Sequence, residues 1–332
     1  MTRIAPRLFH GIAAITITLT PFLGAGTALA DAYPSKPIKL IVPFAAGGGN
    51  DVLARQIGKS MSDNLGQPIV IDNRGGAGGI IAAETAAKSA PDGYTLLWST
   101  AGIHVVNPAI HTKLPYDPVK DWERVGQAVA APVALVVLES SPYRTAQQLI
   151  EQAKKKPGSL SYGSAGNGSS LHQSGEMFKD AAGVDILHVA YKGGGPMTQD
   201  LLAGNIDMIF SYIGAVLPHV KTGKLRILTV GSSKRLSVIP DVPTVGEVVG
   251  KPEFDSDTWN GISAPAKTPQ EAVRRLNEAL THALKENREK LLSSGYVPLG
   301  GTPEQMAQRV ERELKTLTPL LRKVMGPTEG SR

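Results

Sequence analysis

The sequence predicts an α/β fold with mostly parallel sheets flanked by helices, arranged as two lobes. Short apolar runs alternate with amphipathic stretches along most of the chain, which is the pattern of strands that are each followed by a helix. Glycine-rich turns fall repeatedly between the end of an apolar run and the next amphipathic stretch. Two segments, residues 130–138 and 254–264, are extended and apolar with few turn residues. They suit a pair of crossover strands that join two α/β lobes.

The composition is that of an ordinary globular protein, long enough for about two domains. Of the 332 residues, 42% are apolar and 19% are charged, which excludes wholesale disorder, collagen and coiled coil. The lack of cysteine excludes disulfides, thiolate metal sites, cysteine nucleophiles and a cysteine-linked lipid anchor. The formal charge is +6 and falls to +4 without Arg3 and Arg7. Basic residues do not cluster with aromatic ones, so nucleic-acid binding has little support.

Residues 1–30 are expected to be a signal peptide. Two arginines give a positive start, and an apolar run over residues 11–23 follows. This run has the length of a signal-peptide core and is short of the roughly 20 residues that a membrane span needs. Pro21 interrupts it, which disfavours the alternative of an uncleaved anchor helix. Ala28-Leu29-Ala30 predicts cleavage after Ala30, so we expect export and retention in a periplasm.

The strands are expected at the short apolar runs that are rich in β-branched residues. These runs are residues 38–42, 68–71, 94–99, 133–138, 160–163, 186–190, 206–210 and 225–230. Helices are expected where apolar residues recur at helical spacing after a turn. The first three such stretches are residues 51–65, 79–88 and 145–156.

Two helix starts in the C-terminal quarter have clear local signals. Thr268-Pro269-Gln270-Glu271 and Thr302-Pro303-Glu304-Gln305 each place a threonine three residues before an acidic or amide side chain. This spacing predicts a capping box with proline at the first helical position. We therefore expect two amphipathic helices to begin at these two sites.

The two extended segments set the expected domain organisation. Lobe 1 is predicted to comprise residues 31–132 and 255–332, and lobe 2 residues 133–254. The chain would cross between them near residues 130–138 and 254–264. This arrangement makes lobe 2 an insertion within lobe 1 and leaves a cleft between the two.

Four glycine-rich loops lie between an expected strand and the following helix. We name them loop 1 (residues 45–50), loop 2 (74–79), loop 3 (164–170) and loop 4 (192–196). In open α/β sheets such turns lie at the carboxyl edge of the strands, where ligands bind. Glycine lets a ligand approach the backbone, and free N–H groups at a helix N-terminus favour an anion. A single loop is more simply a tight turn, but four together favour a site for a carboxylate or phosphate.

These loops do not match a nucleotide-binding motif. Gly76-Ala77-Gly78 and Gly166-Asn167-Gly168 both lack the third glycine of G-x-G-x-x-G, and nothing matches G-x-x-x-x-G-K-[ST]. No H-E-x-x-H is present, and the histidines are dispersed. We therefore expect neither a cofactor nor a metal.

Signals for an enzyme are weak. The segment Tyr162-Gly163-Ser164-Ala165-Gly166 is similar to a nucleophile elbow, but tyrosine stands where that motif has glycine. An exported hydrolase that uses Ser164 or Ser169 with His172 stays open as an alternative.

The glycine loops and their neighbours carry a family resemblance. Residues 42–51, Val-Pro-Phe-Ala-Ala-Gly-Gly-Gly-Asn-Asp, with Ala54-Arg55 behind them, resemble the opening signature of the tripartite tricarboxylate transporter substrate-binding proteins, the Bug family. Further matches follow in the same order along the mature chain. They are Asp72-Asn73-Arg74 with Gly76-Ala77-Gly78-Gly79, Tyr162 to Gly166 with Gly168-Ser169 and His172, His188 to Gly193 with Pro196, Asp200-Leu201-Leu202, Gly204, Asp207, Lys234-Arg235, Pro240 to Thr244 and Trp259-Asn260-Gly261.

This resemblance implies a periplasmic binding protein of the Venus flytrap type, with no catalytic activity. Such a receptor, expected to be a monomer, captures a small organic carboxylate between its lobes. It hands the ligand to the membrane permease subunits of a tripartite tricarboxylate-type transporter. A ligand sensor for a signalling kinase, built on the same fold, is the other alternative.

The resemblance also implies which residues bind the ligand, mainly through backbone N–H groups and ordered waters. On the first lobe they are Phe44, Ala46, Gly48, Asp51, Ser99 and Thr100. On the second lobe they are Ser164, Gly166, Ser169, His172, Tyr191 and Lys192.

Overall fold

The computed structural model describes residues 1–2, 5 and 33–327. The expected signal peptide therefore lies almost entirely outside the described residues, as does its cleavage site. The chain from Tyr33 onward forms one compact unit. Across the described residues, no helix combines the length and the apolar character that a membrane crossing requires.

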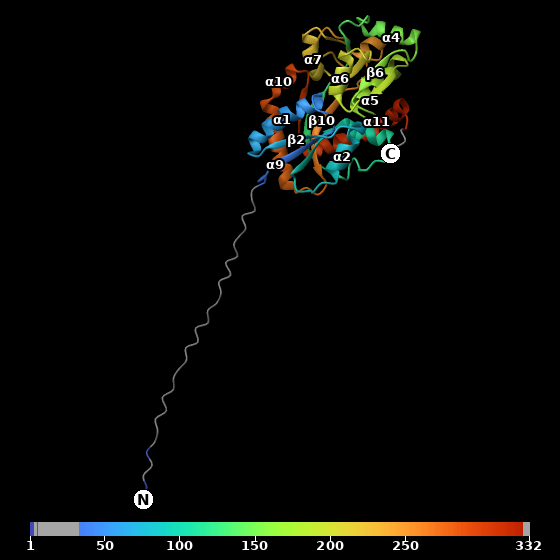
Figure 1. Ribbon diagram of the computed structural model, residues 1–332. Helices are drawn as coiled ribbons and strands as arrows, with labels where there is room; N and C mark the ends of the chain where they lie inside the picture. The colour runs from blue at the N-terminus through green and yellow to red at the C-terminus, as the bar shows by residue number, and fades with distance from the viewer. Residues whose placement is uncertain (3–4, 6–32, 328–332) are drawn as a thin grey trace. The chain divides into compact units, whose positions relative to one another are not determined.

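The compact unit contains two sheets, one in each of two lobes (Figure 1). The first sheet has the strand order β11-β4-β10-β3-β1-β2 and the second β7-β6-β8-β5-β9. The bounds of the first six are β1 (Ile38–Val42), β2 (Ile69–Asn73), β3 (Thr95–Thr100), β4 (Trp122–Ala131), β10 (Thr258–Pro265) and β11 (Val297–Gly300). Those of the second sheet are β5 (Val133–Leu138), β6 (Ser161–Ser164), β7 (Leu187–Ala190), β8 (Met208–Tyr212) and β9 (Leu225–Val230). The two-lobed α/β fold predicted from the sequence is confirmed.

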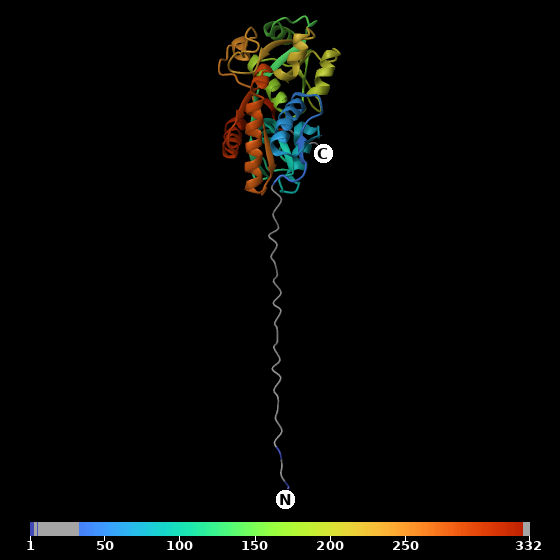
Figure 2. The same ribbon diagram turned by 90° about the vertical axis from the view of Figure 1, so that its left-hand side faces the viewer.

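Helices cover both sheets. They are α1 (Gly49–Leu65), α2 (Ile80–Ala87), α3 (Asn107–Ile110), α4 (Ala146–Lys155), α5 (Ser170–Ala182), α6 (Gly194–Leu202), α7 (Ile213–Lys221), α8 (Val245–Val249), α9 (Gln270–Glu286), α10 (Arg288–Ser293) and α11 (Pro303–Met325), with a 3₁₀ turn η1 (Ala77–Gly79) and a π-helical turn η2 (Gly102–Val106). The beginning and the end of the chain share one lobe. In Figure 2 the orange C-terminal helices lie beside the blue N-terminal elements, and Arg275 of α9 donates a hydrogen bond to Asn64 of α1 at 2.9 Å.

The sheets are mixed, which refines the expectation of mostly parallel sheets. Parallel pairs join β1 with β2 and β3, and β6 with β7 and β8. Antiparallel pairs join β10 with β3 and β4, β11 with β4, and β5 with β8 and β9. The strands β5 and β10 come from the two segments expected to cross between lobes. A strand that enters its sheet from the other lobe starts at the edge where its neighbours end, so it pairs with them antiparallel.

Local signals placed many elements within one or two residues. The strands expected at residues 38–42, 133–138 and 225–230 have those bounds. The strand β4 was missed, because its sequence mixes charged and small residues with apolar ones and lacks a clean alternation. The chain leaves the first sheet after β4 and enters the second at β5, with Pro132 between them. The lobe limits at residues 132/133 and 254/255 stay a prediction.

One of the two expected capping boxes is present. The Thr302 hydroxyl accepts a hydrogen bond from the backbone N–H of Gln305, and the Gln305 side chain bonds back to Thr302. The capping box expected at Thr268 is wrong, because α9 has Pro269 as its N-cap. The Thr268 hydroxyl donates instead to the carbonyl of Pro265 at 2.8 Å. The hydroxyl is thus oriented into the turn that leaves β10, and α9 begins without a side-chain cap.

Candidate functional site

The four glycine loops converge between the two lobes. The N–H of Ala45 in loop 1 donates to the carbonyl of Lys192 in loop 4 at 3.0 Å. The N–H of Gly102, which follows β3, donates to the hydroxyl of Ser170 in loop 3 at 2.9 Å. Loops 1 and 2 belong to strands of the first sheet, and loops 3 and 4 to strands of the second. The convergence that the sequence predicted is therefore present as contacts between lobes.

Backbone approaches backbone so closely here that side chains would not fit. A Cβ atom on Gly78 of loop 2 would lie 1.9 Å from the carbonyl oxygen of Asn167 in loop 3. A Cβ on Gly195 of loop 4 would lie 2.7 Å from the carbonyl oxygen of Ala46 in loop 1. Glycine at these positions is thus required by contact between lobes, as well as by the turns themselves.

Two helix N-termini face each other at this contact. The helices α1 and α6 begin after Gly48 and Gly193, and within the described residues no side chain caps either helix. A Cβ on Gly48 would lie 3.1 Å from the backbone nitrogen of Gly195 and 3.2 Å from that of Gly194. The N-terminus of each helix carries a partial positive charge and unpaired N–H groups. Bringing two of them together, one from each lobe, favours an anion at that place.

A cavity of about 290 Å³ lies beside the two helix N-termini. Its lining consists of Ala46, Gly47, Gly48, Gly194, Gly195, Pro196, Thr198, Gln199, Ala215 and His219. Two larger cavities, of about 590 and 630 Å³, lie around α4, α5 and the end of α11, and around residues 108–121. Neither of these is lined by a residue of the four loops, so the smaller cavity is the candidate ligand site.

Asp51, in the first turn of α1, holds loop 1 in shape. Its carboxylate accepts hydrogen bonds from the N–H of Gly47 at 3.0 Å, from Arg55 at 3.1 Å and from Asn73 at 3.0 Å. Burial works to raise the pKa of Asp51, but the hydrogen bonds from Arg55, Gly47 and Asn73 outweigh it and the pKa is lowered. The carboxylate is therefore ionised, and its oxygens are engaged within its own lobe.

The other residues expected on the first lobe divide into two groups. Ala46 and Gly48 line the cavity, and Phe44 is buried beneath them. Ser99 points into its own lobe, where its hydroxyl bonds to the hydroxyl of Ser263 at 2.8 Å. The Thr100 hydroxyl accepts a hydrogen bond from the N–H of Ile103 at 3.3 Å, which shapes the turn after β3.

On the second lobe, the expected residues mainly shape the loops. The Ser169 hydroxyl caps α5 by accepting from the N–H of His172 at 3.2 Å. The Tyr191 hydroxyl donates a hydrogen bond to the carboxylate of Asp200 at 2.6 Å. The backbone carbonyl of Lys192 accepts the hydrogen bond from the N–H of Ala45 in loop 1 that is described above. Gly166 packs against loop 2, since its Cβ would lie 3.3 Å from the nitrogen of Gly78.

A buried polar cluster between the lobes escaped the sequence analysis. The side-chain oxygen of Asn50 accepts from Trp98 at 3.0 Å and from Asn260 at 2.8 Å. Tyr212 of β8 brings its hydroxyl close to Asn50, Asn260 and Ser170 from the second lobe, and burial raises its pKa. Within residues 33–327, the side-chain oxygen of Asn260 is buried and has no hydrogen-bond partner. Asn50 and Asn260 both lie in stretches that carry the family resemblance, which is the signal that could have identified them.

The structure pairs Ser164 with a different histidine from the one expected for a hydrolase. The Ser164 hydroxyl lies 2.7 Å from Nε2 of His188, and Ser164 is fully buried. The Ser169 hydroxyl accepts from the backbone N–H of His172, as described above. Among the described residues, the structure thus shows no side-chain hydrogen bond from Ser164 or Ser169 to His172, because the parallel pairing of β6 with β7 brings His188 to Ser164 instead. Across the described part of the chain, no three His, Asp or Glu side chains are grouped as metal ligands.

Fold and site together define a two-lobed ligand-binding protein whose lobes meet at backbone-rich loops. Residues 53–325 match the model of the tripartite tricarboxylate transporter family receptor. The chain belongs to this family. It is 38% identical over 293 residues to the UPF0065 protein in the tcbD-tcbE intergenic region of Pseudomonas sp. strain P51, covering 88% of this chain and 87% of that protein.

Solved structures agree with this assignment. The periplasmic binding protein BugD superimposes with a TM-score of 0.85 at 32% identity, covering 89% of this chain and 99% of its own. A Rhodopseudomonas palustris protein solved with adipate gives a TM-score of 0.85 at 36% identity, covering 90% and 100%. MatC from Rhodopseudomonas palustris, solved with bound malate, gives 0.82 at 33% identity, covering 87% and 100%.

Proposed function

We propose that this protein is an exported periplasmic receptor that binds a small organic carboxylate between its lobes. It delivers that acid to the permease subunits of a tripartite tricarboxylate-type transporter and catalyses no reaction itself. The observation that carries the proposal is the meeting of two uncapped helix N-termini, one from each lobe, at Gly48 and Gly194. A carboxylate there accepts hydrogen bonds from both loops and neutralises both partial charges.

The same geometry explains how binding changes the shape of the protein. Lobe 1 (residues 31–132 and 255–332) and lobe 2 (133–254) would turn about the two crossovers near residues 130–138 and 254–264. An acid that touches both lobes stabilises the closed form by its differential affinity for that form. A permease then distinguishes the loaded receptor from the empty one by shape.

The size of the cavity and the relatives support a small acid. A volume of about 290 Å³ holds roughly ten water molecules at about 30 Å³ each, so the ligand has about ten non-hydrogen atoms. Similar proteins were solved with adipate and with malate, and BugD is described as periplasmic.

The test is a binding panel on the purified mature chain. Adipate, malate, citrate, glutamate and benzoate would be added during thermal unfolding, with 1,6-hexanediol as the uncharged match for adipate. A bound acid at a hundred times its Kd adds about 2.7 kcal/mol to the free energy of unfolding, and the diol adds nothing. Mass spectrometry must then recover the acid unchanged. Equal stabilisation by the diol, or conversion of the acid to a product, would overturn the proposal.

A further inference from the structure

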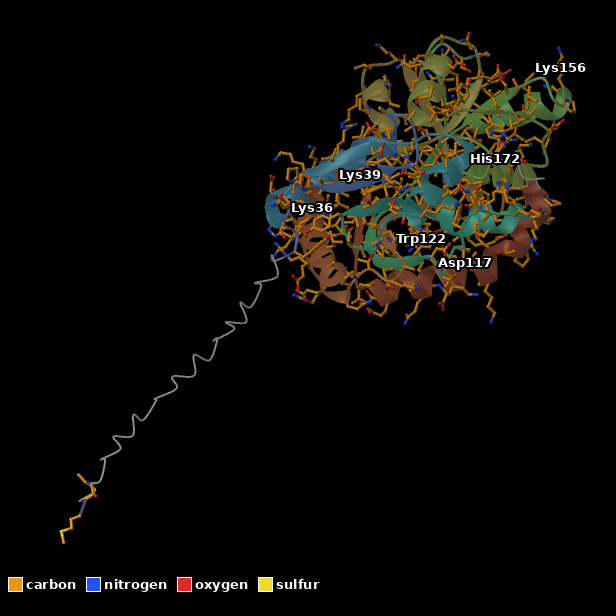
Figure 3. All side chains as sticks on the ribbon, turned by 60° about the horizontal axis from the view of Figure 1, so that its bottom comes forward. Lys36, Lys39, Asp117, Trp122, Lys156 and His172 are labelled. Atoms are coloured by element: carbon orange, nitrogen blue, oxygen red, sulfur yellow. The ribbon has the colours of Figure 1, made fainter. Side chains whose placement is uncertain are left out.

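Two histidines, one buried and one half-buried, contact loop 3, and the capture of a carboxylate by helix N-termini uses neither. His172 is in the first turn of α5 and only 8% exposed, and His188 is in β7. Their rings stack with centroids 4.0 Å apart and planes 15° apart. In Figure 3, His172 lies within the packed part of the molecule, whereas Lys156 is at its surface.

Each ring contacts one part of loop 3. Nδ1 of His172 accepts the N–H of Gly168 at 3.2 Å, so this nitrogen carries no proton. Nε2 of His188 lies 2.7 Å from the hydroxyl of Ser164, the first residue of the loop. That hydroxyl also accepts the N–H of Gly166 at 3.1 Å. The pair therefore holds the loop from Ser164 to Gly168.

The surroundings keep both rings neutral. On α5, Glu176 comes within 3.9 Å of Nε2 of His172, but its carboxylate already accepts from Lys179 at 2.9 Å and from Tyr162 of β6 at 2.6 Å. Burial, with repulsion from Lys179, lowers the pKa of His172 to about 4. Burial and repulsion from the neighbouring ring lower the pKa of His188 to about 3. Two stacked rings at this distance cannot both carry a charge without strong repulsion.

We propose that His172 and His188 are positioning residues whose neutral stacked pair holds loop 3 against loop 2, and that protonation of His172 releases the loop. The proton goes to Nδ1, and the N–H of Gly168 then faces another N–H instead of an acceptor. A positive charge also appears beside the second ring and Lys179. Loop 3 meets loop 2 where the carbonyl of Asn167 touches Gly78, so this contact loosens.

The effect of loop 3 on ligand affinity rests on the proposed function, whereas the release of loop 3 on protonation of His172 does not. In a released loop His172 is hydrated and regains its ordinary pKa of about 6.5. Acidification below that pH then favours the released form of loop 3, whose population rises by up to about tenfold for each pH unit. We expect bound acid to be released as the medium becomes acidic.

The test measures hydrogen exchange at the Gly168 amide in the ligand-free protein between pH 7.5 and 5, corrected for intrinsic exchange. In the wild-type protein, the protection of the Gly168 amide against exchange falls by up to about tenfold per pH unit below pH 6.5. His172→Asn places an amide oxygen near the position of Nδ1 and cannot titrate, so protection is retained and does not change with pH. His172→Leu removes the acceptor, so protection is lost at every pH. Amides of the buried strand β5 report whether each variant is folded.

The hydrogen-exchange result is interpreted independently of ligand binding. Protection at Gly168 that is equal in wild type and His172→Leu would overturn the inference, as would a pH dependence that persists in His172→Asn. Calorimetry with adipate and malate is run on the same samples. Absence of heat with every acid would count against the proposed function and leave the exchange result standing.

Discussion

At the residue scale, the site depends on backbone atoms that side chains must not cover. Gly195 meets the carbonyl of Ala46, and Gly78 meets that of Asn167, across the boundary between lobes. Such contacts do not depend on the chemistry of a side chain, but they leave no space for a Cβ atom on the glycine. A single methyl group at one of them blocks the approach of the lobes and leaves the core of each lobe untouched.

Gly195→Ala is therefore expected to weaken the binding of the acid identified in the panel by at least tenfold. The added methyl would lie 2.7 Å from the Ala46 carbonyl. The matched control is Gly58→Ala in α1, where the nearest atom to the new Cβ is a methyl of Ile69 at 3.4 Å, an ordinary contact. Calorimetry should show unchanged affinity for the control. Equal loss in both variants would contradict this account of the contact between lobes.

Buried histidines also predict how stability depends on pH. The pKa values of His104, His172 and His188 are all lowered by burial, so the unfolded chain binds more protons below about pH 6.5 and stability falls on acidification. Asp257 acts in the opposite direction, because burial and the nearby Asp255 raise its pKa to about 7. For these four groups the net effect is a loss of about 2 kcal/mol in the free energy of unfolding from pH 7 to pH 5.5, and the lowered pKa of the half-buried His111 acts in the same direction. Urea unfolding at the two pH values measures it, and an unchanged midpoint would refute it.

At the element scale, helix ends serve different purposes in different places. The helices α1 and α6 leave their first N–H groups unpaired by side chains at the candidate site, whereas α5, α8 and α11 begin with capped ends. A capped N-terminus would compete with a ligand for the same N–H groups. Helices away from the candidate site, such as α9 and α10, also begin without a side-chain cap, so what distinguishes α1 and α6 is that their uncapped ends lie beside the cavity.

Thr302→Ala should lower the free energy of unfolding by about 1 kcal/mol, because α11 loses its capping box. Thr316→Ala is the matched control on the exposed face of the same helix, where a change within about 0.5 kcal/mol is expected. Denaturant unfolding compares the two variants. Similar losses at both positions would show that the cap makes no specific contribution.

At the scale of the whole molecule, the two crossovers β5 and β10 decide the architecture. Each one enters a sheet at the edge occupied by the glycine loops and continues into the core of that sheet. The loops of both sheets therefore face the same boundary. A receptor of this kind needs this arrangement, because one ligand must contact both lobes to bias closure.

Binding of the acid should shift the solution ensemble toward the closed form. A compact chain of about 300 residues has a radius of gyration of about 19 Å. Small-angle scattering should show a larger radius for the free protein and a fall toward that value with the acid. Gly195→Ala, which blocks the contact of loops 1 and 4, should show little change on adding the acid. A free protein that is already at the closed value would count against closure driven by the ligand.

The sequence by itself determined the features that depend on neighbouring residues. Apolar runs placed β1, β5 and β9, glycine placed the turns between strands and helices, and Thr302 with Gln305 placed the start of α11. The tertiary structure alone decided which distant groups meet. Asn50 bonds to Asn260, Ser164 pairs with His188 rather than His172, and Thr268 is drawn to Pro265 rather than to its helix. Such partners depend on the register and order of strands that are far apart in the chain, and local periodicity contains no information about either.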